Sequence, residues 1–221
     1  MQLADIRAQI PKEVYAALEK EGITDLRPAQ EKAIKNGVLD GKSLLVCTPT
    51  ASGKTLIAEL AAMRAIMNGE GKAIYIAPLK ALANEKHKEF RRRYGHLTGI
   101  ALSVGDIDAA DPHLAEYGWI VTTSEKLDSL LRHHAPWISE VRVMVVDEIH
   151  LLNDPKRGPT LEVIITLLRE LVPAIQIIGL SATIGNPKAL AAWLQAELVE
   201  DSWRPVELRQ GVYYNGAIEF K

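Results

Sequence analysis

Cysteine is scarce in this sequence, and so is any excess of charge of one sign. The 221 residues include one cysteine, Cys47, which cannot form an internal disulfide, so we expect a reduced, intracellular protein. Lys and Arg total 26 and Asp and Glu total 28, which gives a formal net charge of −2. Because so neutral a chain has no general attraction for phosphate, we expect any nucleic acid to bind through a local patch.

Long apolar segments are also missing. The N-terminal stretch MQLADIRAQIPKEV does not contain the apolar centre of a signal peptide. The most apolar stretch, residues 161–180, is interrupted by Glu162, Arg169, Glu170 and Pro173, a pattern typical of a helix, a turn and a strand. With 48% hydrophobic and 24% charged residues the composition is that of a globular protein. We therefore expect a cytoplasmic protein with no membrane contact.

Short apolar, β-branched runs alternate with stretches of helical spacing. The runs cover residues 43–47, 72–77, 99–104, 119–122, 141–146, 175–180 and 197–200. The helical stretches cover residues 54–67, 79–94, 124–133, 160–171 and 187–195. Apolar strands that alternate with helices predict a parallel sheet covered on both faces. Because crossovers between parallel strands are right-handed, the predicted fold is a doubly wound α/β sandwich.

Further elements are predicted on either side of this sheet. Residues 11–20 and 28–35 each have Pro in the first turn and Gly beyond the last, which is typical of helices. Asn215-Gly216 lies between strand-like residues and predicts a hairpin. An isolated hairpin has little to pack against, so we expect it to begin a further unit. The predicted organisation is an N-terminal helical segment at 1–37, a main domain at 38–203, and a linker with a hairpin at 204–221.

The sequence TPTASGKT directly follows an apolar strand and opens a predicted helix. Such a turn directs backbone N–H groups at an anion, and the helix N-terminus adds partial positive charge. Lys54 is suited to the β- and γ-phosphates of a nucleotide, and the Thr55 hydroxyl to Mg²⁺. Thr48 stands where the pattern G-x-x-x-x-G-K-[ST] has its first glycine. We expect Lys54 to face solvent in a phosphate loop formed by Thr48, Pro49, Thr50, Ala51, Ser52, Gly53, Lys54 and Thr55.

A second motif, VMVVDEIH, places two acidic residues after another apolar strand. Ligands of open α/β sheets bind at the carboxyl ends of strands, which is where Asp147 is predicted to lie. Its carboxylate can hold Mg²⁺ and its water shell, and Glu148 can orient or deprotonate an attacking water molecule. With Lys54 as a third catalytic residue and Thr55 as a second metal ligand, the two motifs together predict Mg²⁺-dependent hydrolysis of a nucleoside triphosphate.

These motifs belong to an ordered set that covers nearly the whole chain. The set is LRPAQ (26–30), TPTASGKT (48–55), APLKALANEKH (77–87), VGD (104–106), TTSEKLDSLLR (122–132), VVDEIHLLNDPKRGPTLE (145–162) and GLSATIGNPKALAAWL (179–194). It resembles the first RecA-like motor domain of superfamily 2 DNA helicases of the Ski-like branch, most of all the archaeal Hjm-type repair helicases, which act on stalled replication forks. The resemblance implies a RecA-like P-loop sandwich with a mostly parallel sheet of about seven strands.

The resemblance also implies roles for single residues around the nucleotide. Gln30 resembles the glutamine of the family's Q motif, whose amide can read the edge of adenine and so favours ATP. Arg27 lies in the stretch where the family often has an aromatic residue. Residues that couple the nucleotide site to nucleic acid and to the second motor half are, by the same resemblance, His150, Ser181 and Thr183.

A nucleic-acid face is expected next to this site. Residues 78–80 and 122–124 each follow a strand and open a helix, where N–H groups and hydroxyls suit phosphate oxygens. By resemblance, the nucleic-acid face is formed by Pro78, Lys80, Gly105, Thr123 and Ser124. The charges of residues 91–93 wrap around their helix, so we interpret this stripe as a solvated face. Trp193 has helical spacing with Leu190 and Leu194, and we expect it in the core.

The sequence thus predicts an ATP-binding motor domain of an ATP-dependent DNA helicase in repair and replication-fork processing. Mg-ATP hydrolysis would drive translocation on single-stranded or forked DNA held by its phosphate backbone. We expect the C-terminal motor domain to be missing, and with it an arginine finger worth about 10³–10⁵ in rate, so residues 1–221 should be a weak ATPase that does not unwind. An RNA helicase, a translocase that does not unwind, and a stand-alone nucleotide-switched binding module are the alternatives; the hairpin argues against the last.

Overall fold

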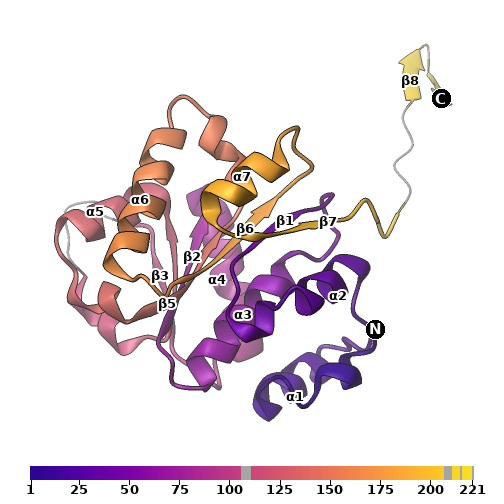
Figure 1. Ribbon diagram of the computed structural model, residues 1–221. Helices are drawn as coiled ribbons and strands as arrows, with labels where there is room; N and C mark the ends of the chain where they lie inside the picture. Colours follow the sequence, from indigo (N-terminus) through magenta and orange to yellow (C-terminus); the bar gives the residue numbers. More distant parts are fainter. Residues whose placement is uncertain (106–110, 207–210, 215, 221) are drawn as a thin grey trace.

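The computed structural model describes residues 1–105, 111–206, 211–214 and 216–220, and a parallel sheet forms its centre (Figure 1). Within the described residues this sheet has seven strands, all of whose neighbouring pairs are parallel, in the order β3-β4-β2-β5-β6-β1-β7. The strands are β1 (Leu44–Cys47), β2 (Lys72–Ala77), β3 (Ile100–Ser103), β4 (Trp119–Thr123), β5 (Val141–Val146), β6 (Gln176–Ser181) and β7 (Glu197–Glu200). The predicted α/β sandwich is confirmed.

Helices cover both faces of the sheet. The α-helices are α1 (Lys12–Lys20), α2 (Pro28–Lys35), α3 (Thr55–Met67), α4 (Lys80–Tyr94), α5 (Ser124–Arg132), α6 (Gly158–Leu171) and α7 (Pro187–Leu194). Helices α1 to α4 lie on one side and α5 to α7 on the other (Figure 1). Short 3₁₀ turns, which the periodicity did not predict, are found at Leu3–Ile6, Val38–Asp40, Pro112–Glu116, Pro136–Glu140 and Ile149–Asn153.

Alternation along each strand divides the core into two layers. Leu44 and Val46 of β1 pack with Ile57 of α3, whereas Leu45 packs in the opposite layer with Ile164 of α6. All five side chains are completely buried, and burial of each such side chain contributes about 1.5–3 kcal/mol. Because both faces are apolar, the strands read as continuous hydrophobic runs.

The N-terminal helices share the first of these layers. Val14 and Leu18 of α1 are buried in the same cluster as the strand residues of the main domain. Glu21, at the end of α1, pairs with Arg92 of α4 at 2.8 Å. Residues 1–37, predicted as an N-terminal helical segment, therefore pack directly on residues 38–203.

Two expectations at the C-terminal part have different outcomes. Strands β8 (Gly211–Tyr214) and β9 (Ala217–Phe220) form the predicted antiparallel hairpin, with Tyr214 opposite Ala217; Asn215 lies outside the described residues. The core position expected for Trp193 is wrong, since its exposed fraction is 36%. The short helix α7 instead buries Ala191 and Leu194, and Trp193 faces outward between them.

The parallel arrangement brings the motifs that follow β1, β2, β4, β5 and β6 to one edge of the sheet. The phosphate loop follows β1, Asp147 follows β5 and Ser181 ends β6, and these three strands are neighbours in the order β5-β6-β1. Pro78 and Ser124 follow β2 and β4 farther along the same edge. Among the described residues, no helix is both long and apolar enough to cross a membrane.

Candidate nucleotide-binding site

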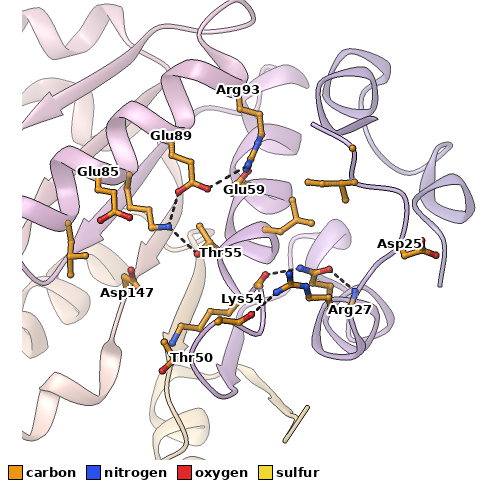
Figure 2. Close-up of a pocket in the computed structure, with 18 of the residues that line it drawn as sticks. Asp25, Arg27, Thr50, Lys54, Thr55, Glu59, Glu85, Glu89, Arg93 and Asp147 are labelled. Carbon is orange, nitrogen blue, oxygen red and sulfur yellow. Dashed lines mark hydrogen bonds and ion pairs between the residues drawn. The ribbon is translucent and has the colours of Figure 1, made fainter. Parts of the chain in front are cut away.

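A cavity of about 690 Å³ lies beside the phosphate loop (Figure 2). It is bounded by four parts of the chain: residues 22–30 before and within α2, the loop and first turns of α3, the inner side of α4, and the two acidic residues after β5. Its wall contains Gln30, Lys54, Thr55, Asp147 and Glu148. The structure thus brings together in one cavity residues that are more than 100 positions apart in the sequence.

The phosphate loop is held by bonds of its own side chains. Thr48 is completely buried, its hydroxyl is hydrogen-bonded to that of Ser52 at 2.7 Å, and its N–H donates to the carbonyl of Ser181 at 3.2 Å. The hydroxyl pair spans the loop from its first to its fifth residue. Threonine in place of the first glycine therefore braces the loop through its hydroxyl, while the backbone N–H of the same residue ties the loop to β6.

Gly53 and α2 fit closely together. Gly53 has φ +86°, and a Cβ atom there would lie 2.6 Å from Nε2 of Gln30 and 3.0 Å from Cδ of Arg27, so a larger residue would collide. Gln30 donates from Nε2 to the Gly53 carbonyl at 2.8 Å and accepts at Oε1 from the Arg27 N–H at 2.8 Å. Arg27 donates from Nη1 to the Ala51 carbonyl at 2.6 Å. Gln30 thus fastens α2 to the loop at the cavity wall.

Lys54 differs from the expected solvent-facing position, and that prediction is wrong. The residue is only 9% exposed, because it lies at the N-cap of α3 next to the acidic residues that follow β5. Its Nζ lies 3.4 Å from Oε1 of Glu148. The ammonium group and the carboxylate therefore form an ion pair in the cavity wall, beside the phosphate loop.

Asp147 is held by a partner that sequence reasoning missed. The Tyr75 hydroxyl donates to Oδ2 of Asp147 at 2.7 Å, and the Glu148 N–H donates to Oδ1 at 3.0 Å. Burial raises the pKa of Asp147, while the Tyr75 hydroxyl acts in the opposite direction. Tyr75 lies in the middle of β2 and is completely buried. Its place beside β5 depends on strand register, which the sequence pattern does not reveal.

The donor set of this cavity suits Mg²⁺. The Thr55 hydroxyl and the carboxylates of Asp147 and Glu148 are hard oxygen donors, the kind that Mg²⁺ prefers. Partial burial raises the pKa of the Asp147 carboxyl, so a cation beside it would stabilise its charged form. Nζ of Lys86, a second residue that sequence reasoning missed, already lies 3.5 Å from Oγ1 of Thr55 and 2.9 Å from Oε2 of Glu89. The site therefore fits a cation.

A chain of contacts links the acidic pair to β6. Nδ1 of His150 lies 3.3 Å from Oε2 of Glu148 and 3.4 Å from Oγ of Ser181. Ser181 is completely buried and also accepts the Thr48 N–H at its carbonyl. Thr183, the third predicted coupling residue, is exposed two residues farther on. The structure thus joins Glu148, His150 and Ser181 directly.

The stripe at residues 91–93 is not a uniform solvated face. Arg93 contacts the buried carboxylate of Glu59 on α3 and lies 3.6 Å from Oε1 of Glu89. Tyr94 donates its hydroxyl to Glu59 at 2.7 Å. Burial raises the pKa of Glu59, and the charge of Arg93 acts in the opposite direction. The interpretation is wrong for Arg93, which joins α3 and α4, whereas Arg91 is exposed.

The predicted nucleic-acid face lies along the same edge but outside this cavity. Thr123 is buried, and its hydroxyl accepts the Lys126 N–H at 3.5 Å as the cap of α5. Pro78 and Ser124 line a small pocket, in which Arg157 donates from Nη1 to the Pro78 carbonyl at 3.3 Å. Sequence reasoning missed Arg157, although it belongs to the quoted string NDPKRGP. Lys80 and Gly105 are exposed, and Asp106 lies outside the described residues.

The sequence of residues 27–190 matches the family described as DEAD/DEAH box helicase. The chain is 54% identical over 214 residues to ATP-dependent DNA helicase Hel308 of Methanocaldococcus jannaschii. The aligned region covers 94% of this chain and 18% of that protein. It is 49% identical over 218 residues to ATP-dependent DNA helicase Hel308 of Pyrococcus horikoshii, and this aligned region covers 99% of the chain and 30% of the relative. The chain thus spans less than a third of the length of these relatives.

Solved structures show the same fold. The crystal structure of the DUF1998 helicase MrfA bound to DNA superposes with a TM-score of 0.75 at 28% identity, covering 88% of this chain and 30% of that one. The structure of MrfA bound to DNA and AMPPNP gives a TM-score of 0.74 at 28% identity.

Proposed function

Since the chain belongs to the DEAD/DEAH box helicase family, we propose that its cavity binds Mg-ATP and that it is the first motor domain of an ATP-dependent DNA helicase. The observation that carries the proposal is the convergence of Lys54, Thr55, Asp147 and Glu148, from two separate strand ends, on one cavity of about 690 Å³. A cation, a hydroxyl and two carboxylates are the groups that phosphoryl transfer to water requires.

Each residue has a distinct task in this proposal. The N–H groups of the phosphate loop and the Lys54 ammonium bind the β- and γ-phosphates. Thr55 and Asp147 would hold Mg²⁺, and the ion would supply positive charge that neutralises the phosphates. Glu148 orients the attacking water and accepts its proton, and its position next to Lys54 and His150 keeps the carboxylate aimed into the cavity. Gln30 contributes to selection of adenine from the cavity wall.

Hydrolysis would be coupled to nucleic acid through β6. The contacts from Glu148 through His150 to Ser181 connect the water-orienting carboxylate to the strand next to β1 and β5. The relatives are named ATP-dependent DNA helicases, and a structural neighbour is a DNA complex. We infer that single-stranded or forked DNA binds by its phosphate backbone along the nucleic-acid face. The greater length of the relatives supports a second motor domain that completes the grip on DNA.

The test is ATP binding by a Lys54→Met variant, which preserves side-chain volume at this buried position. Loss of a charge-assisted contact, worth about 1.5–3 kcal/mol, should weaken Mg-ATP binding by about 10–100-fold in isothermal titration. The control is Lys188→Met on α7, an exposed lysine outside the cavity, which should bind like the wild type. Wild-type affinity in Lys54→Met, at an unchanged thermal midpoint, would exclude the cavity as the nucleotide site.

A further inference from the structure

We propose that Arg157 is a further DNA-binding residue, whose guanidinium binds one phosphate of the DNA backbone beside the residues of the nucleic-acid face. The inference rests on the proposed function, because it assumes that DNA lies along this face. It adds to that function a specific cation, placed where the ends of β2, β4 and β5 meet.

The guanidinium of Arg157 reaches the ends of three neighbouring strands. Arg157 shares a small pocket with Pro78 after β2, Ser124 after β4 and Asp147 after β5, and β2 lies between β4 and β5 in the sheet. Its Nη1 donates to the Pro78 carbonyl at 3.3 Å, which places the guanidinium itself at the end of the middle strand. Two of the residues that share this pocket, Pro78 and Ser124, belong to the nucleic-acid face.

The backbone that carries Arg157 is held firmly. Oδ1 of Asp154 accepts the N–H groups of Lys156 and Arg157 at 2.8 and 2.9 Å. The Gly158 N–H donates to the Asp154 carbonyl at 2.8 Å, and a Cβ atom at Gly158 would lie 2.2 Å from the Leu152 carbonyl oxygen. Because this turn is already ordered, little conformational entropy is lost when the side chain binds a ligand.

The positive charge of Arg157 is not neutralised by a neighbouring acid. Among the residues that the structure describes, its guanidinium forms no ion pair, and the Pro78 carbonyl is its hydrogen-bond partner. Arg93 differs, since its guanidinium pairs with Glu59 and Glu89. A guanidinium has five N–H donors, so most of those of Arg157 are available. A half-buried cation with available donors suits a phosphate, which it can bind through two parallel hydrogen bonds.

The position of Arg157 favours a DNA phosphate over a phosphate of the nucleotide. Lys54 and Thr55 line the nucleotide cavity, and Arg157 is not among the described residues that do so. Half or more of the hydrogen bonds between proteins and DNA go to phosphate and sugar, and arginine is a frequent donor. Since the chain has a net charge of −2, its attraction for DNA depends on such well-placed cations.

The experiment compares two cations that are adjacent in the sequence. A fluorescently labelled single-stranded oligothymidine is titrated with the 221-residue chain across a salt series, and anisotropy gives the affinity. Arg157→Met should weaken binding about fivefold at low salt and reduce the magnitude of the slope of log affinity against log salt by about 0.7, the value of one phosphate contact on a single strand. Lys156→Met removes the same charge from an exposed position and should change the affinity less than about twofold.

A third variant and the slope itself distinguish DNA binding from a structural role. Arg157→Lys preserves the charge without the planar donor pair, so it should keep the slope and weaken binding about two- to threefold. A residue that only held the Pro78 turn would change the affinity and leave the slope unchanged. All variants are measured well below their thermal midpoints, which calorimetry determines.

An unchanged slope in Arg157→Met, or equal changes of slope in Arg157→Met and Lys156→Met, would overturn the inference. Failure of the proposed function gives different results. If DNA did not bind along the nucleic-acid face, Lys80→Ala would also leave the slope unchanged, and if the cavity did not bind the nucleotide, Lys54→Met would bind Mg-ATP like the wild type.

Discussion

The proposed phosphate end of the cavity and the proposed nucleic-acid face lie along one edge of the sheet, but they are built in different ways. At the phosphate end, side chains are buried or half-buried and bonded to one another, as in the pairs Thr48–Ser52 and Asp147–Tyr75. On the nucleic-acid face Lys80 and Gly105 are exposed, while the buried Thr123 hydroxyl caps a helix. A preorganised site stabilises one charge distribution strongly, whereas exposed groups contribute small amounts of binding free energy that salt screens. Single substitutions should therefore have large effects on nucleotide chemistry and small ones on DNA binding.

The largest effect is expected for Glu148→Gln. The amide preserves the shape but cannot accept a proton from water, so single-turnover hydrolysis should slow by about 10²–10⁴ while ATP still binds. Glu170→Gln on α6, an exposed acid, serves as the control. If Glu148→Gln hydrolyses ATP at the wild-type rate, the water-orienting role belongs to another residue.

Arg93→Met tests whether Arg93, in the stripe at residues 91–93, stabilises the fold through Glu59 or belongs to the nucleic-acid face. Removing the guanidinium leaves the buried Glu59 carboxylate with the Tyr94 hydroxyl as its remaining close partner, which should cost about 3 kcal/mol of unfolding free energy. The thermal midpoint should fall by about 6–12 °C, and calorimetry measures it directly. Arg91→Met, at an exposed position on the same helix, should leave the midpoint within about 1 °C. A drop in DNA affinity without loss of stability would assign Arg93 to the nucleic-acid face.

Asp147→Asn should affect Mg²⁺ binding more than the orientation of the attacking water molecule. Loss of the carboxylate charge should lower the affinity for Mg²⁺ about tenfold, so that ATP binding depends less on Mg²⁺. Mg²⁺ titrations at fixed ATP measure this change. Tyr75→Phe removes one hydrogen bond to Oδ2 and should have a smaller effect, of about 1 kcal/mol or less. Equal effects of Asp147→Asn and Glu148→Gln on nucleotide affinity, with hydrolysis spared, would contradict the division of tasks between the two acids.

The smallest effects are expected on the nucleic-acid face. Two or three phosphate contacts give a slope of log affinity against log salt of about −2 for single-stranded DNA. Lys80→Ala should reduce the magnitude of this slope by about 1 without changing the sequence preference. Lys88→Ala, also exposed on α4, is the matched control. Fluorescence anisotropy across a salt series measures the slope. A slope of about −6 or steeper would mean that further basic residues, such as Arg91, bind DNA.

These differences also explain how much of the fold and of the candidate site could be predicted from the sequence. Strand and helix limits followed from apolar periodicity to within a residue or two, as for β2 and β5, because buried parallel strands need continuous apolar side chains. The motifs also contain residues that the structure places in the cavity wall, such as Lys54, Thr55 and Asp147, because the members of each motif are neighbours in the sequence. The contacts of Tyr75 with Asp147 and of Arg93 with Glu59 join elements by strand register and helix packing, which local patterns do not encode. The burial of Lys54 was missed for the same reason.

The most direct test is a crystal structure of the 221-residue chain with Mg²⁺ and a non-hydrolysable ATP analogue. The triphosphate should lie on the N–H groups of the phosphate loop beside Lys54, with Mg²⁺ at Thr55 and Asp147 and the base toward Gln30. A nucleotide bound elsewhere, or phosphates that do not contact this loop, would contradict the assignment of the cavity.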